Sequence, residues 1–150
     1  MTVVPFARAH VAEAAALERL CFSAPWSAQA LAEELDNPQA VFRAAVDENG
    51  RLLGYAGMFH VVDEGFFANV AVLPDCRRQG VASALMDALR AYGETHGLCR
   101  LTLEVRVSNA AAIALYERHG YVRDGIRRGF YCEPREDAAI YSLYFAKPKE

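Results

Sequence analysis

The chain has 150 residues and a formal net charge of −3; 53% of the residues are hydrophobic and 23% are charged. This balance predicts one folded domain over residues 1–150 and argues against extensive disorder and nucleic-acid binding. The sequence has no apolar run near the roughly 20 residues that cross a bilayer, no signal-peptide pattern at its start and no Cys-x-x-Cys pair. We therefore expect a cytoplasmic protein that needs no metal.

The first half of the chain predicts two helices between strands. A strand is expected at residues 2–8 and an apolar-faced helix at 11–22. Ser27 is a candidate N-cap for a short helix ending near Leu35, before Asn37-Pro38. Residues 41–47 and 52–62 flank an Asn-Gly turn and predict a hairpin, which a strand at 65–72 extends.

The second half predicts a long helix at residues 81–96 and a strand at 100–105. A helix at 109–119 follows and is stopped by Gly120, and two strands at 121–127 and 138–145 close the chain. The order βααβββαβαββ predicts an α+β fold, with one sheet and helices on both of its faces.

Residues 72–83 predict an anion site. An apolar strand turns there into a helix, whose first backbone N–H groups have no internal partners and lie at the positive end of the helix dipole. Gly80 lets the backbone approach a ligand, and Arg77 and Arg78 add positive charge. The segment matches neither the P-loop nor the Gly-x-Gly-x-x-Gly pattern. A solvated basic turn that caps the helix is the alternative.

Residues 77–82 (Arg-Arg-Gln-Gly-Val-Ala) resemble the Gln/Arg-x-x-Gly-x-Gly/Ala signature of the GNAT superfamily, the acetyl-CoA-dependent N-acetyltransferases. The element order also resembles the GNAT fold, whose sheet is mixed and mostly antiparallel. Segments 103–106 (Leu-Glu-Val-Arg), 108–117 and 126–128 resemble its branch of bacterial ribosomal-protein alanine N-acetyltransferases. Ala82 departs from the usual second glycine, and residues 129–130 and 132–133 also differ, in the loop that would meet the substrate.

The resemblance implies acetyl-CoA as cosubstrate and no metal. It makes Glu104 the general base and Tyr116 the acid that protonates the leaving thiolate. Tyr131 would border the peptide path, and Asp63 and Glu64 could steer a basic peptide. The residues expected at the cofactor are Val70, Ala71, Val72, Arg77, Arg78, Gln79, Gly80, Val81, Ala82, Ser83 and Asn109.

Several of these residues also have a purely structural interpretation. Glu104 could be an exposed strand carboxylate, Asn109 an N-cap, Tyr116 a packed ring and Tyr131 part of the loop packing.

The implied reaction is acetyl transfer to the N-terminal α-amine of a protein whose first residue is alanine. The expected acceptor is a basic ribosomal protein. A GNAT enzyme acting on a small amine or a lysine side chain is the alternative, and a non-catalytic CoA-binding sensor is an alternative of another class.

Overall fold

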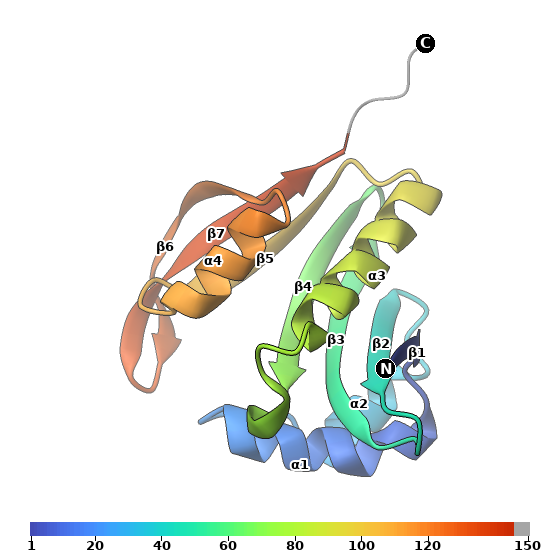
Figure 1. Ribbon diagram of the computed structural model, residues 1–150. Coiled ribbons are helices and arrows are strands. Elements are labelled where there is room, and N and C mark those ends of the chain that lie inside the picture. The colour runs from blue at the N-terminus through green and yellow to red at the C-terminus, as the bar shows by residue number, and fades with distance from the viewer. Residues whose placement is uncertain (146–150) are drawn as a thin grey trace.

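A seven-stranded sheet forms the centre of the computed structural model, which describes residues 1–145 (Figure 1). The strands are β1 (Thr2–Pro5), β2 (Ala40–Val46), β3 (Leu52–Val61), β4 (Glu64–Val72), β5 (Arg100–Arg106), β6 (Val122–Cys132) and β7 (Arg135–Tyr144). The helices are α1 (Val11–Cys21), α2 (Ala28–Glu34), α3 (Val81–Thr95) and α4 (Ala110–Arg118), with short 3-10 turns η1 (Arg8–His10) and η2 (Pro74–Cys76). No helix among these residues is long and apolar enough to span a membrane.

The sheet has the order β1-β2-β3-β4-β5-β7-β6. Only β4 and β5 pair in parallel, and every other neighbouring pair is antiparallel. This topology confirms the expected α+β fold with a mixed, mostly antiparallel sheet. Ser27 caps α2 by accepting a hydrogen bond from the N–H of Ala30 at 3.1 Å, and Gly120 has a φ of 90°, as expected of a glycine that ends a helix.

Three strands differ in extent from the expectation. The first strand ends at Pro5, because the chain turns into η1. The last two strands run much further, β6 to Cys132 and β7 from Arg135, and pair with each other as a long hairpin. Their register shifts between Arg127 and Tyr131, where Gly129 has a φ of 62°. This polar segment lacks the regular alternation that predicts a strand, so its pairing was not foreseen.

Apolar side chains pack the helices against both faces of the sheet. Leu85 and Leu89 of α3 pack with Leu101 and Leu103 of β5, and the ring of Tyr116 on α4 joins the same core. A second core on the opposite face contains side chains of α1, α2 and the strands β2 to β4. Its members include Leu17, Leu31, Phe42, Ala44 and Tyr55. The helices thus cover both faces.

The parallel pair β4–β5 opens partway along its length. Its ladder covers only Glu64↔Arg100, Gly65↔Leu101 and Phe66↔Thr102. Beyond Phe66 and Thr102 the strands diverge, as Figure 1 shows for the green and yellow-brown ribbons. β4 also has a bulge there, since Asn69 pairs with Gly57 but Phe67 pairs with Met58. The splay exposes backbone groups of both strands.

Candidate active site

The turn between β4 and α3 presents free backbone donors. Gly80 is the N-cap of α3 in a left-handed conformation (φ 81°), without a side-chain cap. The first helical bond runs from the N–H of Ala84 to the carbonyl of Gly80 at 3.0 Å, so the N–H groups of Val81, Ala82 and Ser83 have no partner within the helix. A Cβ on Gly80 would meet no atom within 4 Å. The glycine is therefore needed for its backbone angle and for the space above it.

This turn forms one wall of a cavity of about 870 Å³ between β4, α3 and α4. All residues predicted to hold acetyl-CoA line it except Gln79, whose side-chain amide donates to the carbonyl of Asp75 at 3.3 Å. Tyr116 lines it as well. A hollow of this size suits a cofactor-sized ligand. The structure therefore brings together two segments of the chain that lie some 30 residues apart.

Several other residues that line the cavity were not foreseen from the sequence. They come from the end of α1 with its C-cap and from α4, namely Cys21, Phe22, Ala111, Ala112, Ala114, Leu115 and Arg118. The run of alanines in α4 was a usable signal, since small side chains let a ligand approach a helix closely. The end of α1 carried no such signal.

The helix α4 positions both Asn109, its N-cap, and Tyr116. The Asn109 Oδ1 accepts a hydrogen bond from the N–H of Ala112 at 3.2 Å, so Asn109 is an N-cap as well as a cavity residue. Tyr116 is 8% exposed, and burial, with Tyr131 nearby, raises the pKa of its hydroxyl to about 12. The Tyr116 hydroxyl is therefore protonated at neutral pH and can donate a proton into the cavity.

Glu104 lies on β5, on the opposite face from Leu103 and Val105, which are buried with α3 and α4. Its side chain is 25% exposed, and its Oε1 lies 3.5 Å from Nε of Arg127. Glu104 does not line the 870 Å³ cavity, and neither does any other residue of β5. A carboxylate there can meet an acceptor that approaches from the α1 side of the sheet.

Tyr131 lies in the same neighbourhood as Glu104. Burial, with the Glu104 charge second, raises the pKa of Tyr131 above its usual value. The guanidinium of Arg106 stacks 4.3 Å from the centroid of the Tyr131 ring. The sequence did not single out Arg106, although its place two residues after Glu104 on a strand puts both side chains on one face.

Asp63 and Glu64 do not reach this region, which corrects the expectation that they flank the cleft. They lie at the start of β4, where the Glu64 carboxylate pairs with Arg100, whereas the cavity lies at the strand's other end, at Val72. A nine-residue strand is about 30 Å long. Glu64 pairs with Arg100, four residues before Glu104 on β5, so roughly 13 Å of strand separates Glu64 from Glu104.

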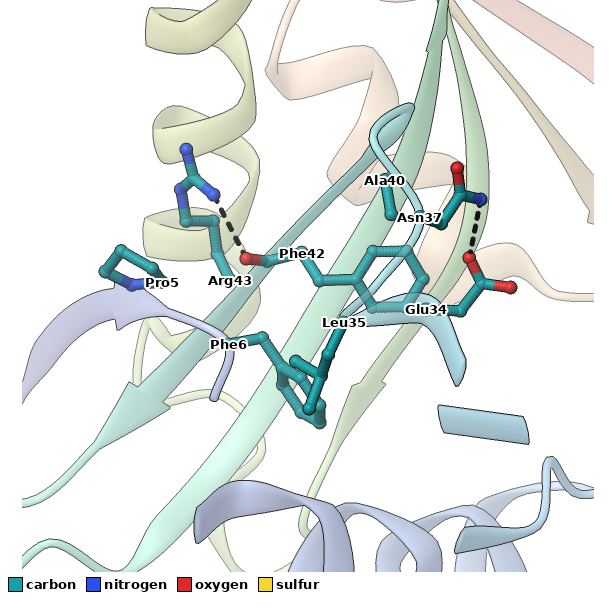
Figure 2. Close-up of a pocket in the computed structure, with 8 residues that line it drawn as sticks. All are labelled: Pro5, Phe6, Glu34, Leu35, Asn37, Ala40, Phe42 and Arg43. Carbon is teal, nitrogen blue, oxygen red and sulfur yellow. Dashed lines mark hydrogen bonds between the residues drawn. The ribbon is translucent and has the colours of Figure 1, made fainter. Parts of the chain in front are cut away.

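A second hollow, of about 190 Å³, lies between β1, β2 and the end of α2 (Figure 2). Its polar groups are bonded to one another: Asn37 donates to Glu34 at 2.9 Å, and Arg43 donates to the carbonyl of Phe42 at 3.0 Å. None of the predicted site residues lines it. The larger cavity is therefore the candidate site.

The model of the acetyltransferase (GNAT) family matches residues 11–121, which span both the anion turn and the strand that carries Glu104. The chain belongs to the GNAT family. Acetyl-CoA is the acetyl donor of GNAT enzymes, and the free N–H groups at the start of α3, with Arg77 and Arg78 beside them, suit its pyrophosphate. The chain is accordingly an acetyl-CoA-dependent N-acetyltransferase.

GNAT relatives cover most of the chain. It is 40% identical over 129 residues to the [ribosomal protein bS18]-alanine N-acetyltransferase of Escherichia coli, covering 85% of this chain and 86% of the relative. The Salmonella typhimurium enzyme of the same name is 36% identical with the same coverage. The crystal structure of the Escherichia coli ribosomal-protein-S18-alanine N-acetyltransferase superposes with a TM-score of 0.89, over 99% of this chain and 96% of that one, at 35% identity.

Proposed function

We propose that this GNAT enzyme acetylates the N-terminal α-amine of a ribosomal protein that begins with alanine. The observation that carries the proposal is the similarity, over 85% of the chain, to an enzyme named for that reaction. An acceptor of this kind would be met in the cytoplasm, where we place the reaction. The net charge of −3 favours a basic acceptor.

We assign acetyl-CoA to the cavity between β4, α3 and α4. The pyrophosphate would lie on the N–H groups of residues 81–83, with Arg77 and Arg78 as counter-charges. The backbone of residues 70–72 lines the cavity at the splay and would align the thioester there, and Asn109 would contact the coenzyme from the start of α4. Holding the two reactants in contact supplies most of the rate in such a transfer.

The acceptor would enter on the α1 side of the sheet, where Glu104 and Tyr131 lie. Its nitrogen attacks the thioester carbonyl carbon, an amide bond forms and the carbon–sulfur bond breaks. Glu104 takes the proton that the amine loses, directly or through a water, and Tyr116 donates its proton to the departing thiolate. The high pKa of Tyr116, about 12, keeps that proton in place until the thiolate forms.

The α-amine is an easier acceptor than a lysine. Its pKa of about 7.7–8.0 means that deprotonation at pH 7.4 costs about 0.5 kcal/mol, against roughly 4 kcal/mol for a lysine with a pKa of about 10.4. One carboxylate base is adequate for the first task. We therefore expect selectivity for the α-amine on the order of 100-fold or more.

The test compares three acceptors with the purified protein: a basic peptide that begins with alanine, the same peptide with a blocked N-terminus and an internal lysine, and a polyamine. Acetylation of the first alone supports the proposal. Preference for the lysine peptide or the polyamine contradicts it in favour of a side-chain or small-amine acetyltransferase. Mass spectrometry of protein N-termini, in cells with and without the gene, then identifies the natural acceptor.

A further inference from the structure

Glu18 is a fully buried carboxylate (0% exposed) on α1, and the mechanism above does not use it. Its oxygens accept three hydrogen bonds, from the N–H of Trp26 at 2.9 Å, the hydroxyl of Tyr55 at 2.7 Å and the side-chain amide of Asn69 at 2.6 Å. The Trp26 N–H and the Asn69 amide nitrogen can only donate, and the Tyr55 hydroxyl donates as well, so the Glu18 oxygens act as acceptors. Within residues 1–145 Glu18 forms no ion pair.

A buried carboxylate lowers the stability of the fold at a position where an apolar side chain could pack instead, because the carboxylate loses its hydration. Burial raises the pKa of Glu18 above its usual value, and the three hydrogen bonds only partly oppose this effect. Position 18 lies on the apolar face of α1, next to the buried Ala14, Ala15 and Leu17. Packing alone does not call for a carboxylate there, so its role is to be sought in what its three partners do.

Asn69 is the partner that reaches the splay. It lies at the bulge of β4, and its Oδ1 accepts the N–H of the next residue, Val70, at 3.1 Å. Because the Glu18 carboxylate only accepts, it holds the Asn69 amide with nitrogen toward α1 and oxygen toward Val70. Val70 itself lines the cavity that we assign to acetyl-CoA. The orientation of one backbone N–H at the splay thus depends on a charge buried under α1.

Asn69 and Glu104 lie on opposite walls of the splay. The last rung of the β4–β5 ladder is Phe66↔Thr102, so Asn69 follows it closely on one strand and Glu104 on the other. Asn69 bonds to α1, and Glu104 lies on the face of β5 opposite the core of α3 and α4. Both side chains are therefore on the α1 side, where we place the acceptor.

The N–H of Trp26 connects the same carboxylate to the segment between α1 and α2. Earlier in that segment, Ser23 donates to the carbonyl of Glu133 in the turn between β6 and β7 at 2.9 Å. Glu18 therefore holds one end of a segment that contacts the β6–β7 turn, as well as the bulge of β4.

We propose that Glu18 is a positioning residue for the acceptor: it fixes the Asn69 amide at the β4 bulge and the segment at Trp26, and so orders the wall that faces Glu104. The inference rests on the proposed function, because that function places the acceptor at this wall. Glu18 touches no reacting atom, and its effect passes through Asn69 and Val70 on one side and through Trp26 on the other.

The decisive variant is Glu18→Gln, which keeps the size of the side chain but offers one acceptor oxygen in place of two. Initial rates are measured while acetyl-CoA and the alanine-initiated peptide are each varied. We expect kcat/KM for the peptide to fall about tenfold or more, because the variant loses a charged hydrogen bond. The dissociation constant of acetyl-CoA should stay within about twofold of wild type. Equal peptide kinetics in Glu18→Gln would reduce Glu18 to a structural residue.

Asn69→Ala breaks the same path without disturbing the charge, and remains informative if Glu18→Gln folds poorly. It should lower peptide kcat/KM by no more than Glu18→Gln does, and the double variant should be no worse than Glu18→Gln alone, because Asn69→Ala removes one of the two connections that Glu18→Gln weakens. Additive losses would overturn the proposal. Tyr55→Phe is the matched control: it removes another donor to the same carboxylate, on β3, and should lower stability while peptide kcat/KM stays near wild type.

Hydrogen exchange of the Val70 amide, measured by NMR, tests the positioning directly and needs no acceptor. Exchange should be faster in Glu18→Gln than in wild type, as in Asn69→Ala. Unchanged exchange in Glu18→Gln contradicts the proposal even if the natural acceptor proves to be another amine. A wild type that acetylates no peptide, with Val70 exchange still dependent on Glu18, would instead refute only the proposed function.

Discussion

The hydroxyl of Ser23 donates to the carbonyl oxygen of Glu133 at 2.9 Å, although 110 positions separate the two residues in the chain. The bond joins the segment between α1 and α2 to the turn between β6 and β7. Arg106 donates to the same carbonyl at 3.2 Å and to the carbonyl of Pro134 at 2.8 Å. The strand that carries Glu104 thus also anchors the far turn.

Arg106→Met should loosen that turn. The variant loses both carbonyl contacts and the 3.2 Å ion pair with Glu136, so we expect peptide kcat/KM to fall about tenfold while acetyl-CoA affinity is unchanged. Ser23→Ala removes one neutral hydrogen bond and should lower the free energy of unfolding by about 1 kcal/mol or less. Arg123→Met, at an exposed position of β6, is the control and should match wild type. Equal losses in Arg123→Met would point to general charge effects.

Gly80→Ala tests the anion turn. A side chain at φ 81° is strained by about 1–2 kcal/mol and enters the space that the pyrophosphate is proposed to use, so acetyl-CoA should bind at least about tenfold more weakly. Gly97→Ala is a closely matched control, since Gly97 also has a positive φ (68°) and no atom within 4 Å of an added Cβ, but does not line the cavity. Isothermal titration should separate the two. Similar weakening in both would remove the turn from the site.

Tyr116→Phe should reduce kcat about 100-fold, because it deletes the proposed proton donor and keeps the ring. The raised pKa, about 12, places the loss of that proton far above neutrality, so the wild-type rate should show no descending limb from Tyr116 below about pH 11. Steady-state rates and thermal unfolding are measured for wild type, for Tyr116→Phe and for the control variant Tyr121→Phe.

Tyr121→Phe supplies the control for Tyr116. The Tyr121 ring lies 6.1 Å from that of Tyr116, and its buried hydroxyl has no hydrogen-bond partner within residues 1–145. Removing an unsatisfied buried hydroxyl should leave activity intact and stability equal or higher. If Tyr116→Phe behaves in the same way, its hydroxyl has no chemical role.

Glu104→Gln should leave acetyl-CoA binding unchanged and lower peptide acetylation. The remaining activity should recover as the pH rises above about 8, where most of a free α-amine is already neutral, whereas wild type should level off at lower pH. The measurement is kcat/KM against pH for one alanine-initiated peptide. Glu64→Gln, at the other end of β4, should follow the wild-type profile. A Glu104→Gln profile identical to wild type would mean that the base lies elsewhere.

Local signals in the sequence determined the order of the elements. The alternation of residues 100–105 predicted a strand, in which Leu101, Leu103 and Val105 are indeed buried on one face. Ser27 and Gly120 marked helix ends by chemistry that acts over a few residues, which is why their roles could be predicted. The anion turn was also a local pattern, because a strand, a glycine and a helix start follow one another directly in the chain.

Other features depended on which segments meet in space. Asp63 and Glu64 lie at the start of β4, and the length of the strand separates them from the anion turn that follows Val72. The long β6–β7 hairpin forms because two polar segments satisfy each other's backbone groups. Neither segment by itself predicts the full hairpin, because its backbone hydrogen bonds exist only when the two segments pair.

Glu18 shows the same division within one side chain. A glutamate on the apolar face of a predicted helix is visible in the sequence, but its meaning depends on Trp26, Tyr55 and Asn69, which come from three other segments. The chain by itself predicted the residues that we propose for the acetyl-transfer chemistry and the elements that hold them. Only the tertiary structure decided how β4 and β5 separate and which side chains face each other across the gap, because long-range packing sets both.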